Sequence, residues 1–278
     1  MSEYITLVNN VKTFDNTMSD FRTKLGKIVK LDGNWLVGLS EITYTKSWYN
    51  LLYDHKITLF DEMGQTYGEK SNIYDNQFTI SAGFYESPMK LISAINKILS
   101  SFTQITPPKL IYNEINNYVI LQVGKIDNSI KIFPDLGREI EDILGLRDRN
   151  SIYNMYLPIQ LNNYSVTDIT VKNIHSRDEI IGFHPVEISG GFHSLFLYTD
   201  IVYPSLVGDT FANLLRVVEI PRKYKFGETV HKEYPNPQYR PVRLNEFETI
   251  EISIKDDSGM SIPFKFGRIN LTLHLKQR

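Results

Sequence analysis

The alternation of apolar and polar residues near the C-terminus is the feature that most limits the fold of this chain. Apolar side chains occupy every second position from Ile250 to Ile254 and again from Ile269 to Leu275. The stretch between them begins with Asp256-Asp257-Ser258-Gly259, a turn sequence in which glycine can adopt a positive φ. A period of two residues places one face of a strand on a core and the other toward water. This region therefore predicts two long β-strands that close a sandwich.

Further strands are predicted along the rest of the chain. Residues from Phe21 to Tyr44 predict a hairpin, because strand patterns flank the turn Asp32-Gly33-Asn34. Outside one interruption, the sequence predicts eight strands, at residues 21–31, 35–45, 56–60, 194–202, 214–220, 229–242, 248–255 and 268–275. Eight antiparallel strands in two packed sheets form a jelly roll. We therefore expect a mainly β protein built on a single eight-stranded antiparallel jelly roll.

Residues 78–146 interrupt the β pattern with helical signals. Ser87 is a good N-cap, Pro88 suits the first helical position, and apolar residues follow at helical spacing. Asp135 is expected to cap a second helix that ends at Gly145, where a left-handed C-cap belongs. Three short strands are predicted between the helices, at residues 110–112, 118–123 and 129–132. Such a unit can hold its own core, which predicts an inserted α+β subdomain.

The expected organisation has four parts. They are an N-terminal arm at 1–18, the first part of the jelly roll at 19–65, the inserted α+β subdomain with its flanking loops at 66–190, and the second part of the jelly roll at 191–278. Two further strands are plausible within the flanking loops, at 156–161 and 166–171. The arm is polar and has no clear period, so we expect a flexible end or a segment that lies on a neighbouring molecule.

The composition excludes several classes of function. The 278 residues include no cysteine, which rules out disulfides, thiolate catalysis and cysteine-bound metals. The formal net charge is -2, without the basic excess of a dedicated nucleic-acid binder, so no specific nucleic-acid partner is expected. No apolar run approaches the roughly 20 residues that span a bilayer, and the first residues do not resemble a signal peptide. We expect no membrane span and no secretory signal.

The histidines offer one candidate metal site. His184 and His193 flank a Gly-Gly turn and could approach each other together with Glu187, since imidazole and carboxylate suit zinc or iron. Solvated loop histidines are the simpler interpretation, and we predict no metal site. The sequence contains no convincing catalytic or cofactor-binding motif. The chain is therefore predicted not to be an enzyme, with no catalytic residues and no cofactor.

Three other stretches have structural interpretations. Asp256-Asp257-Ser258-Gly259 could hold calcium, but it lacks the ligand series of an EF-hand loop, and a plain turn is expected. Glu248 and Glu251 are expected on opposite faces of their strand, where they cannot form an acid/base pair. Val207-Gly208-Asp209-Thr210 predicts a well-defined corner between two strong strands. We expect the function to lie in the surface that such corners shape.

Several motifs of this chain, taken in their order, resemble those of one family of capsid proteins. The motifs span most of the sequence and include Gly33 to Tyr44, Ser47 to Asn50, Phe84 to Ser87, Leu91-Ile92, Ile95-Asn96, Ile143 to Leu146, Leu197 to Val202, Leu206 to Thr210, Leu214 to Val218, Tyr239 to Val242, and Phe247-Glu248-Thr249-Ile250 through Leu273-His274-Leu275. In these motifs the chain resembles the penton, or vertex minor capsid, proteins of Polinton/Maverick elements and Mavirus-like virophages.

The resemblance implies a structural virion protein. Pentons of this family are single jelly rolls with an inserted domain, and they form pentamers that occupy the fivefold vertices of an icosahedral capsid. For this chain the resemblance implies a homo-pentamer surrounded by a double jelly-roll major capsid protein, at the capsid vertices of a virion assembled in the host cytoplasm. It transfers no catalytic or binding residues, and the residues of the subunit interface stay unassigned.

Two alternatives remain open. One is a receptor- or glycan-binding jelly-roll module on a virion surface, with residues 78–148 as the binding knob. The other is a cupin-like enzyme, since jelly rolls include the cupins. The enzyme requires metal-binding histidines that point into the barrel, whereas His274 falls on the outward phase of its strand.

Overall fold

The computed structural model divides the chain into two compact units. The jelly-roll unit comprises Met1–Tyr49 and Phe192–Arg278, and the insert unit comprises Asn50–Gly191. Every strand pair within the described part of the chain is antiparallel. The structure describes residues 1–9, 15–61, 66–67, 78–102, 105–127, 129–147, 178–189, 192–221 and 223–278. The strands expected at 156–161 and 166–171 lie outside these residues.

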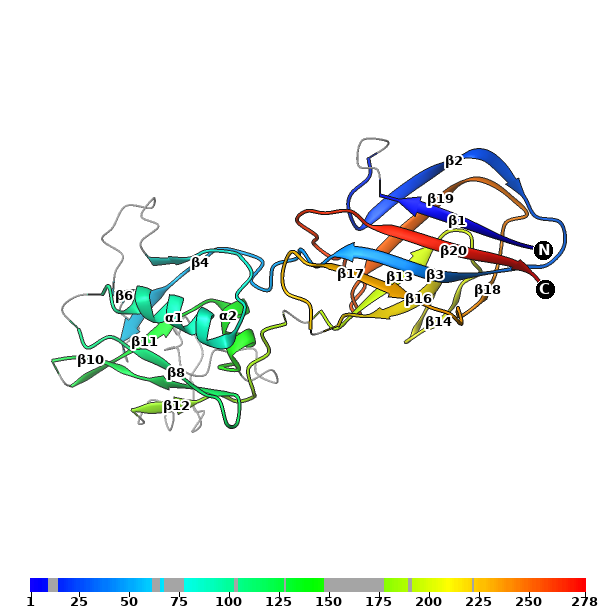
Figure 1. Ribbon diagram of the computed structural model, residues 1–278. Helices are drawn as coiled ribbons and strands as arrows, with labels where there is room; N and C mark the ends of the chain where they lie inside the picture. The colour runs from blue at the N-terminus through cyan, green and yellow to red at the C-terminus, as the bar shows by residue number, and fades with distance from the viewer. Residues whose placement is uncertain are drawn as a thin grey trace, which may run out of the picture. The chain divides into compact units, whose positions relative to one another are not determined.

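Two sheets pack face to face in the jelly-roll unit (Figure 1). The first sheet contains, in order, β1 (Ser2–Val8), β20 (Asn270–Gln277), β3 (Trp35–Thr45) and β17 (Thr229–Glu233), while β18 (Arg240–Pro241) also pairs with β3. The second sheet contains, in order, β16 (Leu214–Glu219), β13 (Ser194–Thr199), β19 (Glu246–Lys255) and β2 (Asp20–Lys30). Between β13 and β16 the chain forms a separate hairpin of β14 (Ser205–Val207) and β15 (Thr210–Ala212).

The order of the strands identifies the topology. The eight long strands of this unit are β1, β2, β3, β13, β16, β17, β19 and β20, and they can be numbered 1 to 8 in chain order. In these numbers the strand order is 1-8-3-6 in the first sheet and 5-4-7-2 in the second. This is the B-I-D-G and F-E-H-C order of a jelly roll, and it confirms the predicted mainly β fold. The described residues place five strands in one sheet and four in the other, because β18 is a short strand of its own. Eight of these nine are the long strands numbered above, and the predicted count of eight is not confirmed.

Burial along β20 follows the alternation that the sequence predicts. Ile269, Leu271, Leu273 and Leu275 have no exposed surface, and the residues between them face outward. Burying one such side chain contributes about 1.5–3 kcal/mol, whereas an exposed ion pair contributes at most about 1 kcal/mol. The apolar core between the sheets therefore determines the stability of this unit, and the charges on its surface adjust it.

The first residues form a strand and not an arm. β1 pairs with β20 along its whole length, from Ser2 opposite Lys276 to Val8 opposite Asn270. Ile5 and Leu7 are buried, whereas Tyr4, Thr6 and Val8 are exposed. The expectation of an arm at 1–18 is wrong for residues 2–8. The sequence obscures this alternation because β1 also carries large apolar side chains, Tyr4 and Val8, on its exposed face.

The hairpin predicted from Phe21 to Tyr44 is also wrong. β2 pairs with β19 in the second sheet, whereas β3 pairs with β20 and β17 in the first. The predicted turn is present, and Gly33 has a φ of +85°. The chain uses this turn to cross from one sheet to the other, and the local sequence does not distinguish a crossover from a hairpin because both need a turn.

The predicted strand at 56–60 belongs to the insert unit. It is divided between β4 (His55–Lys56) and β5 (Thr58–Asp61), which pair with strands of the insert. The insert unit therefore begins at residue 50 and not at 66. A short strand has the same pattern in either unit, and only its partners decide where it belongs.

An aromatic cluster marks the place where the chain leaves and rejoins the jelly-roll unit. The Trp48 ring lies 6.0 Å from the Phe192 ring and 5.4 Å from the Phe264 ring, measured between centroids. Tyr44 and Trp48 are both almost completely buried. Edge-to-face aromatic pairs of this kind add about 0.5–1.5 kcal/mol beyond their burial. The two chain crossings are thus held together by the core of the jelly roll itself.

The two helices of the insert unit follow most of the predicted signals. α1 (Pro88–Leu99) begins after Ser87, whose hydroxyl accepts a hydrogen bond from the Lys90 amide. α2 (Arg138–Leu144) begins after Gly137, so Asp135 is not its N-cap, and the Asp135 carboxylate instead accepts from the Gly137 amide at 2.9 Å. Gly145 has a φ of 72° and forms the predicted left-handed C-cap.

Short sheets and the two helices share the core of the insert unit. One sheet contains β10 (Gly124–Ile126), β11 (Ile130–Asp135), β5 and β6 (Thr66–Tyr67), and a second contains β12 (Glu179–Ile181), β9 (Tyr118–Gln122) and β8 (Lys109–Asn113), while β4 pairs with β7 (Thr79–Ile80). Leu91, Ile95 and Leu99 of α1 contribute to a core separate from that of the jelly roll. The insert therefore has the independent core that its sequence predicts.

A substitution at Gly267 tests the close approach of the last loop to β3. Gly267 has a φ of +104°, and a Cβ there would clash with the Thr45 side chain. We expect Gly267→Ala to lower the free energy of unfolding by roughly 2 kcal/mol or more, measured by urea denaturation. Gly26→Ala is the matched control, because a Cβ at Gly26 meets no atom within 4 Å. Equal stability of the two variants would contradict this account.

Removal of the insert tests the independence of the jelly roll. Because Trp48 contacts Phe192, a short Gly-Ser linker can replace residues 50–191 without stretching the chain. We expect the shortened protein to keep a cooperative thermal transition and the near-ultraviolet circular dichroism of a packed Trp48. A chain that is soluble but lacks both signals would show that the jelly roll needs the insert to fold.

Candidate assembly surface

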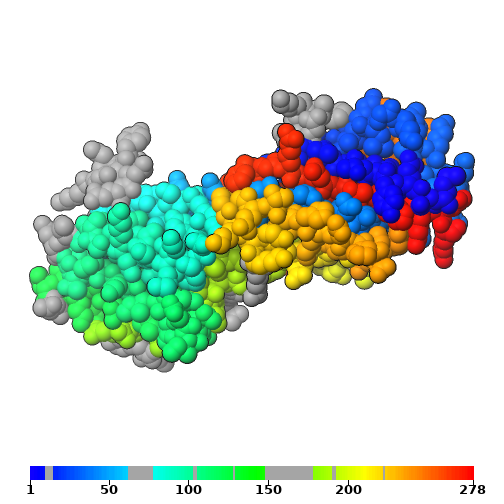
Figure 2. Space-filling model, in the orientation of Figure 1, coloured from blue at the N-terminus to red at the C-terminus, as the bar shows by residue number. Residues whose placement is uncertain are grey.

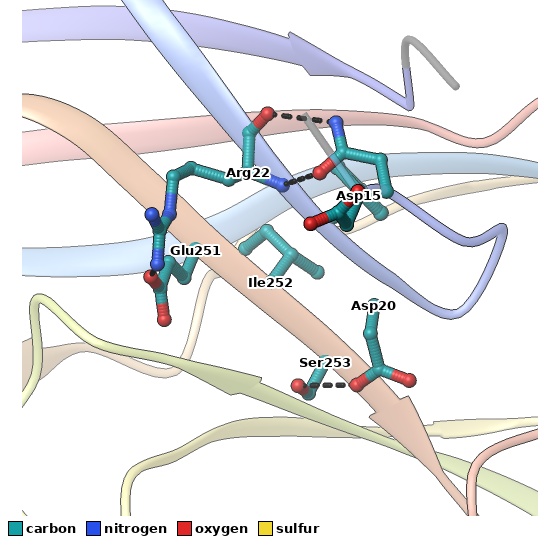
Figure 3. Close-up of a pocket in the computed structure, with 8 residues that line it drawn as sticks. Asp15, Asp20, Arg22, Glu251, Ile252 and Ser253 are labelled. Carbon is teal, nitrogen blue, oxygen red and sulfur yellow. Dashed lines mark hydrogen bonds and ion pairs between the residues drawn. The ribbon is translucent and has the colours of Figure 1, made fainter. Parts of the chain in front are cut away.

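A hollow of about 410 Å³ lies beside the start of β2 and the second half of β19 (Figure 3). It is lined by Asp15, Asn16, Asp20, Phe21, Arg22, Glu251, Ile252 and Ser253. Asn16 fixes the start of β2, since its amide group accepts from the Arg22 N–H at 2.9 Å and donates to the Arg22 carbonyl at 3.0 Å. The loop before β2 is thereby tied to the sheet edge.

Asp20 joins three segments at this hollow. One of its carboxylate oxygens accepts from the Ser253 hydroxyl at 2.6 Å, and the other accepts from the Ser261 hydroxyl at 2.7 Å. Arg22 forms an ion pair with Glu251 on the neighbouring strand. Asp20, Arg22 and Glu251 therefore partner other side chains of the chain, and they hold β2, β19 and the segment after β19 together. This arrangement suits a structural role better than acid/base chemistry.

Cross-strand ion pairs continue along β2 and β19. Lys24 pairs with Glu248 at 3.1 Å, and Lys30 pairs with Glu246 at 3.7 Å. The expectation that Glu248 and Glu251 lie on opposite faces is wrong, because the register shifts between Phe247 and Thr249 and both glutamates pair with β2. The shift leaves Glu248 of β19 and residues 25–28 of β2 outside the regular register, and such an irregularity places positions 248 and 251 on the same face. Each pair is about half exposed, so it contributes only about 0.2–1 kcal/mol.

Asp200 lies partly buried beside the same strand. Its carboxylate accepts a hydrogen bond from the Glu251 amide at 2.9 Å, and the Arg243 guanidinium donates to its carbonyl at 3.0 Å. Burial raises the pKa of the Asp200 carboxyl above its ordinary value, and this effect exceeds the opposing effect of the hydrogen bonds and of Arg243. The local sequence does not predict these contacts, because Asp200, Arg243 and Glu251 come from segments that are distant in the chain.

The candidate metal ligands are divided between the two units. His184 and Glu187 belong to the insert unit, and His193 belongs to the jelly-roll unit. The Glu187 carboxylate accepts from the Ser189 amide at 3.0 Å, and His184 Nδ1 lies 3.0 Å from the Pro185 carbonyl. Within the described ranges, no group of three or more histidine, aspartate or glutamate side chains is placed to hold a metal.

The acidic turn after β19 has the plain structure that its sequence predicts. One oxygen of Asp256 accepts from the amides of Ser258 and Met260, each at 2.9 Å, and from the Ser258 hydroxyl at 2.7 Å. Gly259 has a φ of +85°. The Asp256 carboxylate is engaged in shaping the turn, which is the usual role of aspartate there.

His274 lies on the outer face of the first sheet. Its ring stacks on Tyr4 at 4.4 Å, and its Nδ1 lies 2.8 Å from the Tyr239 hydroxyl. Burial and the nearby Lys276 lower the pKa of His274. Among the described jelly-roll residues, the histidines 193, 231 and 274 all lie outside the buried core. A cupin-like site, which needs histidines inside the barrel, is therefore not found there.

Comparisons with known proteins give structural matches only. No protein-family model and no curated protein sequence matches the chain. The crystal structure of the mavirus penton protein matches with 11% identity and a TM-score of 0.48, over 99% of each chain. A chain of the Sputnik virophage structure, determined by cryo-electron microscopy, matches with 10% identity and a TM-score of 0.43, over 99% of this chain and 97% of that one. These values describe a distant likeness of fold and not a shared function. None of the helices in the described ranges has the length and apolar character to cross a membrane.

The pH dependence of stability tests the position of Asp200. A carboxyl whose pKa is raised by folding stabilises the folded state below its ordinary pKa of 3.8, and this contribution is lost as the pH rises through the raised pKa. We expect Asp200→Asn, which keeps the acceptor oxygen, to gain stability relative to the parent protein between pH 4 and pH 7, measured by urea denaturation. Asp257→Asn, on the exposed turn, is the control. A relative loss with rising pH would contradict the burial of Asp200.

Proposed function

We propose that this chain is a structural capsid protein, a penton that forms the pentameric fivefold vertices of an icosahedral capsid. The observation that carries the proposal is where the motifs of the resemblance lie in the fold. Gly33 to Tyr44 covers most of β3, Leu197 to Val202 covers the end of β13, and Leu214 to Val218 covers β16. These are strands of the two sheets, and the resemblance therefore concerns the framework of the jelly roll.

The insert supports the same proposal. The motifs at Leu91-Ile92, Ile95-Asn96 and Ile143 to Leu146 fall on the buried face of α1 and on the end of α2. The resemblance thus extends to the core of the insert unit and is not confined to one sheet. A jelly roll interrupted between its third and fourth long strands by a compact unit is the organisation that the resemblance implies.

The chemistry of the surface also favours assembly over catalysis. The acidic side chains Asp20, Glu248, Glu251 and Asp256 all form hydrogen bonds or ion pairs within the chain. A ring of five subunits needs heterologous contacts that close on rotation, and such contacts depend on shaped loops and edges. On this proposal the partners are four other copies of the chain and a double jelly-roll major capsid protein, and the protein resides in the virion.

The proposal is tested by assembling shells. The chain is co-expressed with a double jelly-roll major capsid protein of the family that it resembles, and closed particles are imaged by cryo-electron microscopy. We expect density that fits five jelly rolls at each fivefold vertex and open vertices in particles made without this chain. Closed particles that never contain the chain, or that contain it away from the vertices, would refute the proposed function.

A further inference from the structure

Two groups of exposed apolar side chains lie at opposite edges of the jelly roll, while others, such as Met260 and Phe266, lie elsewhere on the unit. At one edge, β1 and β2 carry Tyr4, Val8 and Ile28, which are 62%, 40% and 51% exposed. At the opposite edge lie Tyr203, two residues before β14, and Leu206 and Phe211 of the β14–β15 hairpin, which are 53%, 66% and 75% exposed. Figure 1 shows β1 and β2 along the upper edge of this unit and β14 and β16 along the lower edge. In Figure 2 the blue N-terminal strands and the yellow-to-orange segments occupy the same two opposite sides of the unit.

The β14–β15 hairpin presents its apolar side chains in a fixed position. Leu206 and Phe211 are directly opposite each other in the hairpin ladder, so both project from one face. The base of the hairpin is held by Asn213, whose side chain donates to the Val202 carbonyl at 3.0 Å and whose carbonyl accepts from the Thr199 amide at 3.1 Å. An ordered, exposed apolar pair of this kind indicates a contact with another molecule, because the hairpin would lose little conformational entropy when a partner covers it.

The β1–β2 edge presents a surface of complementary character. The β2 register skips from Lys24 to Val29 across the bulge opposite Phe247 and Thr249, and this brings Ile28 outward. Lys24, Lys27 and Lys30 surround it, and each lysine is more exposed than the glutamate with which it pairs. Bulges and lysines on an edge strand prevent another strand from extending the sheet. A partner at this edge is therefore expected to dock through side chains.

We propose that the β14–β15 hairpin of one copy packs against the β1–β2 edge of the next copy. This inference rests on the proposed function, since a ring of identical subunits needs two different surfaces on opposite sides of each subunit. Leu206 and Phe211 of one copy contact Ile28 and its apolar neighbours on the next. Asp209, at the exposed turn of the hairpin, faces the lysines of β2 on the next copy. This charge complementarity orients the two copies relative to each other.

The size of the two patches sets the strength of the contact. Two aromatic side chains and one leucine bury on the order of 400 Å² of surface, if each aromatic ring contributes about 150–250 Å². A stable interface buries about 800 Å² on each partner. The hairpin contact therefore supplies about half of such an interface, and association in solution depends on the concentration of the protein.

Two single substitutions and their mixture test the contact. Phe211→Asp removes the apolar tip of the hairpin, and Ile28→Asp places an acidic group in the opposite edge; both positions are exposed, so folding is expected to persist. Ile115→Asp is the matched control, because Ile115 is 96% exposed in the insert unit. Sedimentation velocity over a concentration series measures association, and circular dichroism verifies folding.

The contact predicts different results for the separate variants and for their mixture. The parent protein and Ile115→Asp associate, whereas Phe211→Asp and Ile28→Asp alone have dissociation constants at least about tenfold higher, which corresponds to about 1.4 kcal/mol. An equimolar mixture of the two variants forms pairs and no rings, because one variant retains an intact edge and the other retains an intact hairpin. A parent protein that stays monomeric, a Phe211→Asp variant that associates like the parent, or a mixture without pairs would each overturn the inference.

The same variants separate this inference from the proposed function. If the parent protein occupies the capsid vertices and Phe211→Asp occupies them equally well, the hairpin contact is refuted and the capsid role stands. If the parent protein associates through the hairpin in solution but never enters a shell, the capsid role is refuted and the contact stands.

Discussion

The pairing of β20 with strands on both sides is the interaction on which the jelly roll depends. β20 hydrogen-bonds to β1 on one side and to β3 on the other, so it joins the edge strand β1 to the rest of the first sheet. Its inward side chains, from Leu271 to Leu275, are fully buried against the second sheet. Without β20 the first strand has no partner in the sheet, and the core between the two sheets is open on one side.

The insert is compatible with this framework because of where it departs. The chain leaves the jelly roll after Trp48 and returns at Phe192, and these two rings are in contact within the aromatic cluster. The two ends of the insert are thus fixed close together by the jelly roll, and closing a long excursion between nearby points costs entropy that grows only slowly with its length. The separate core of the insert unit then supplies its own stability. The surface features of the jelly roll can therefore be considered by themselves.

The sequence predicted those parts of the structure that depend on local patterns. The buried positions of β19 and β20, the N-cap at Ser87 and the left-handed C-cap at Gly145 all follow from periodicity or from the needs of a single residue. The pairing of β1, the crossover after β2 and the placement of 56–60 depend on partners far along the chain, which no local pattern specifies. The same limit applies to the hollow beside β2, where Asp20 and Glu251 come together only after the strands have paired, and to the hydrogen bond from the Glu251 amide to Asp200. Sequence periodicity also assumes a regular strand, and the register shift between β19 and β2 breaks that assumption at Glu248.

The position of β20 between β1 and β3 also determines when the first sheet can form during synthesis. Ser2 to Val8 are synthesised well before their hydrogen-bonding partners, which lie at residues 270–276. Residues 50–191 are complete long before that point and carry a core of their own. β1 and β3 therefore lack their shared neighbour until residues 270–276 have been synthesised, so the first sheet can close only after the insert unit is complete.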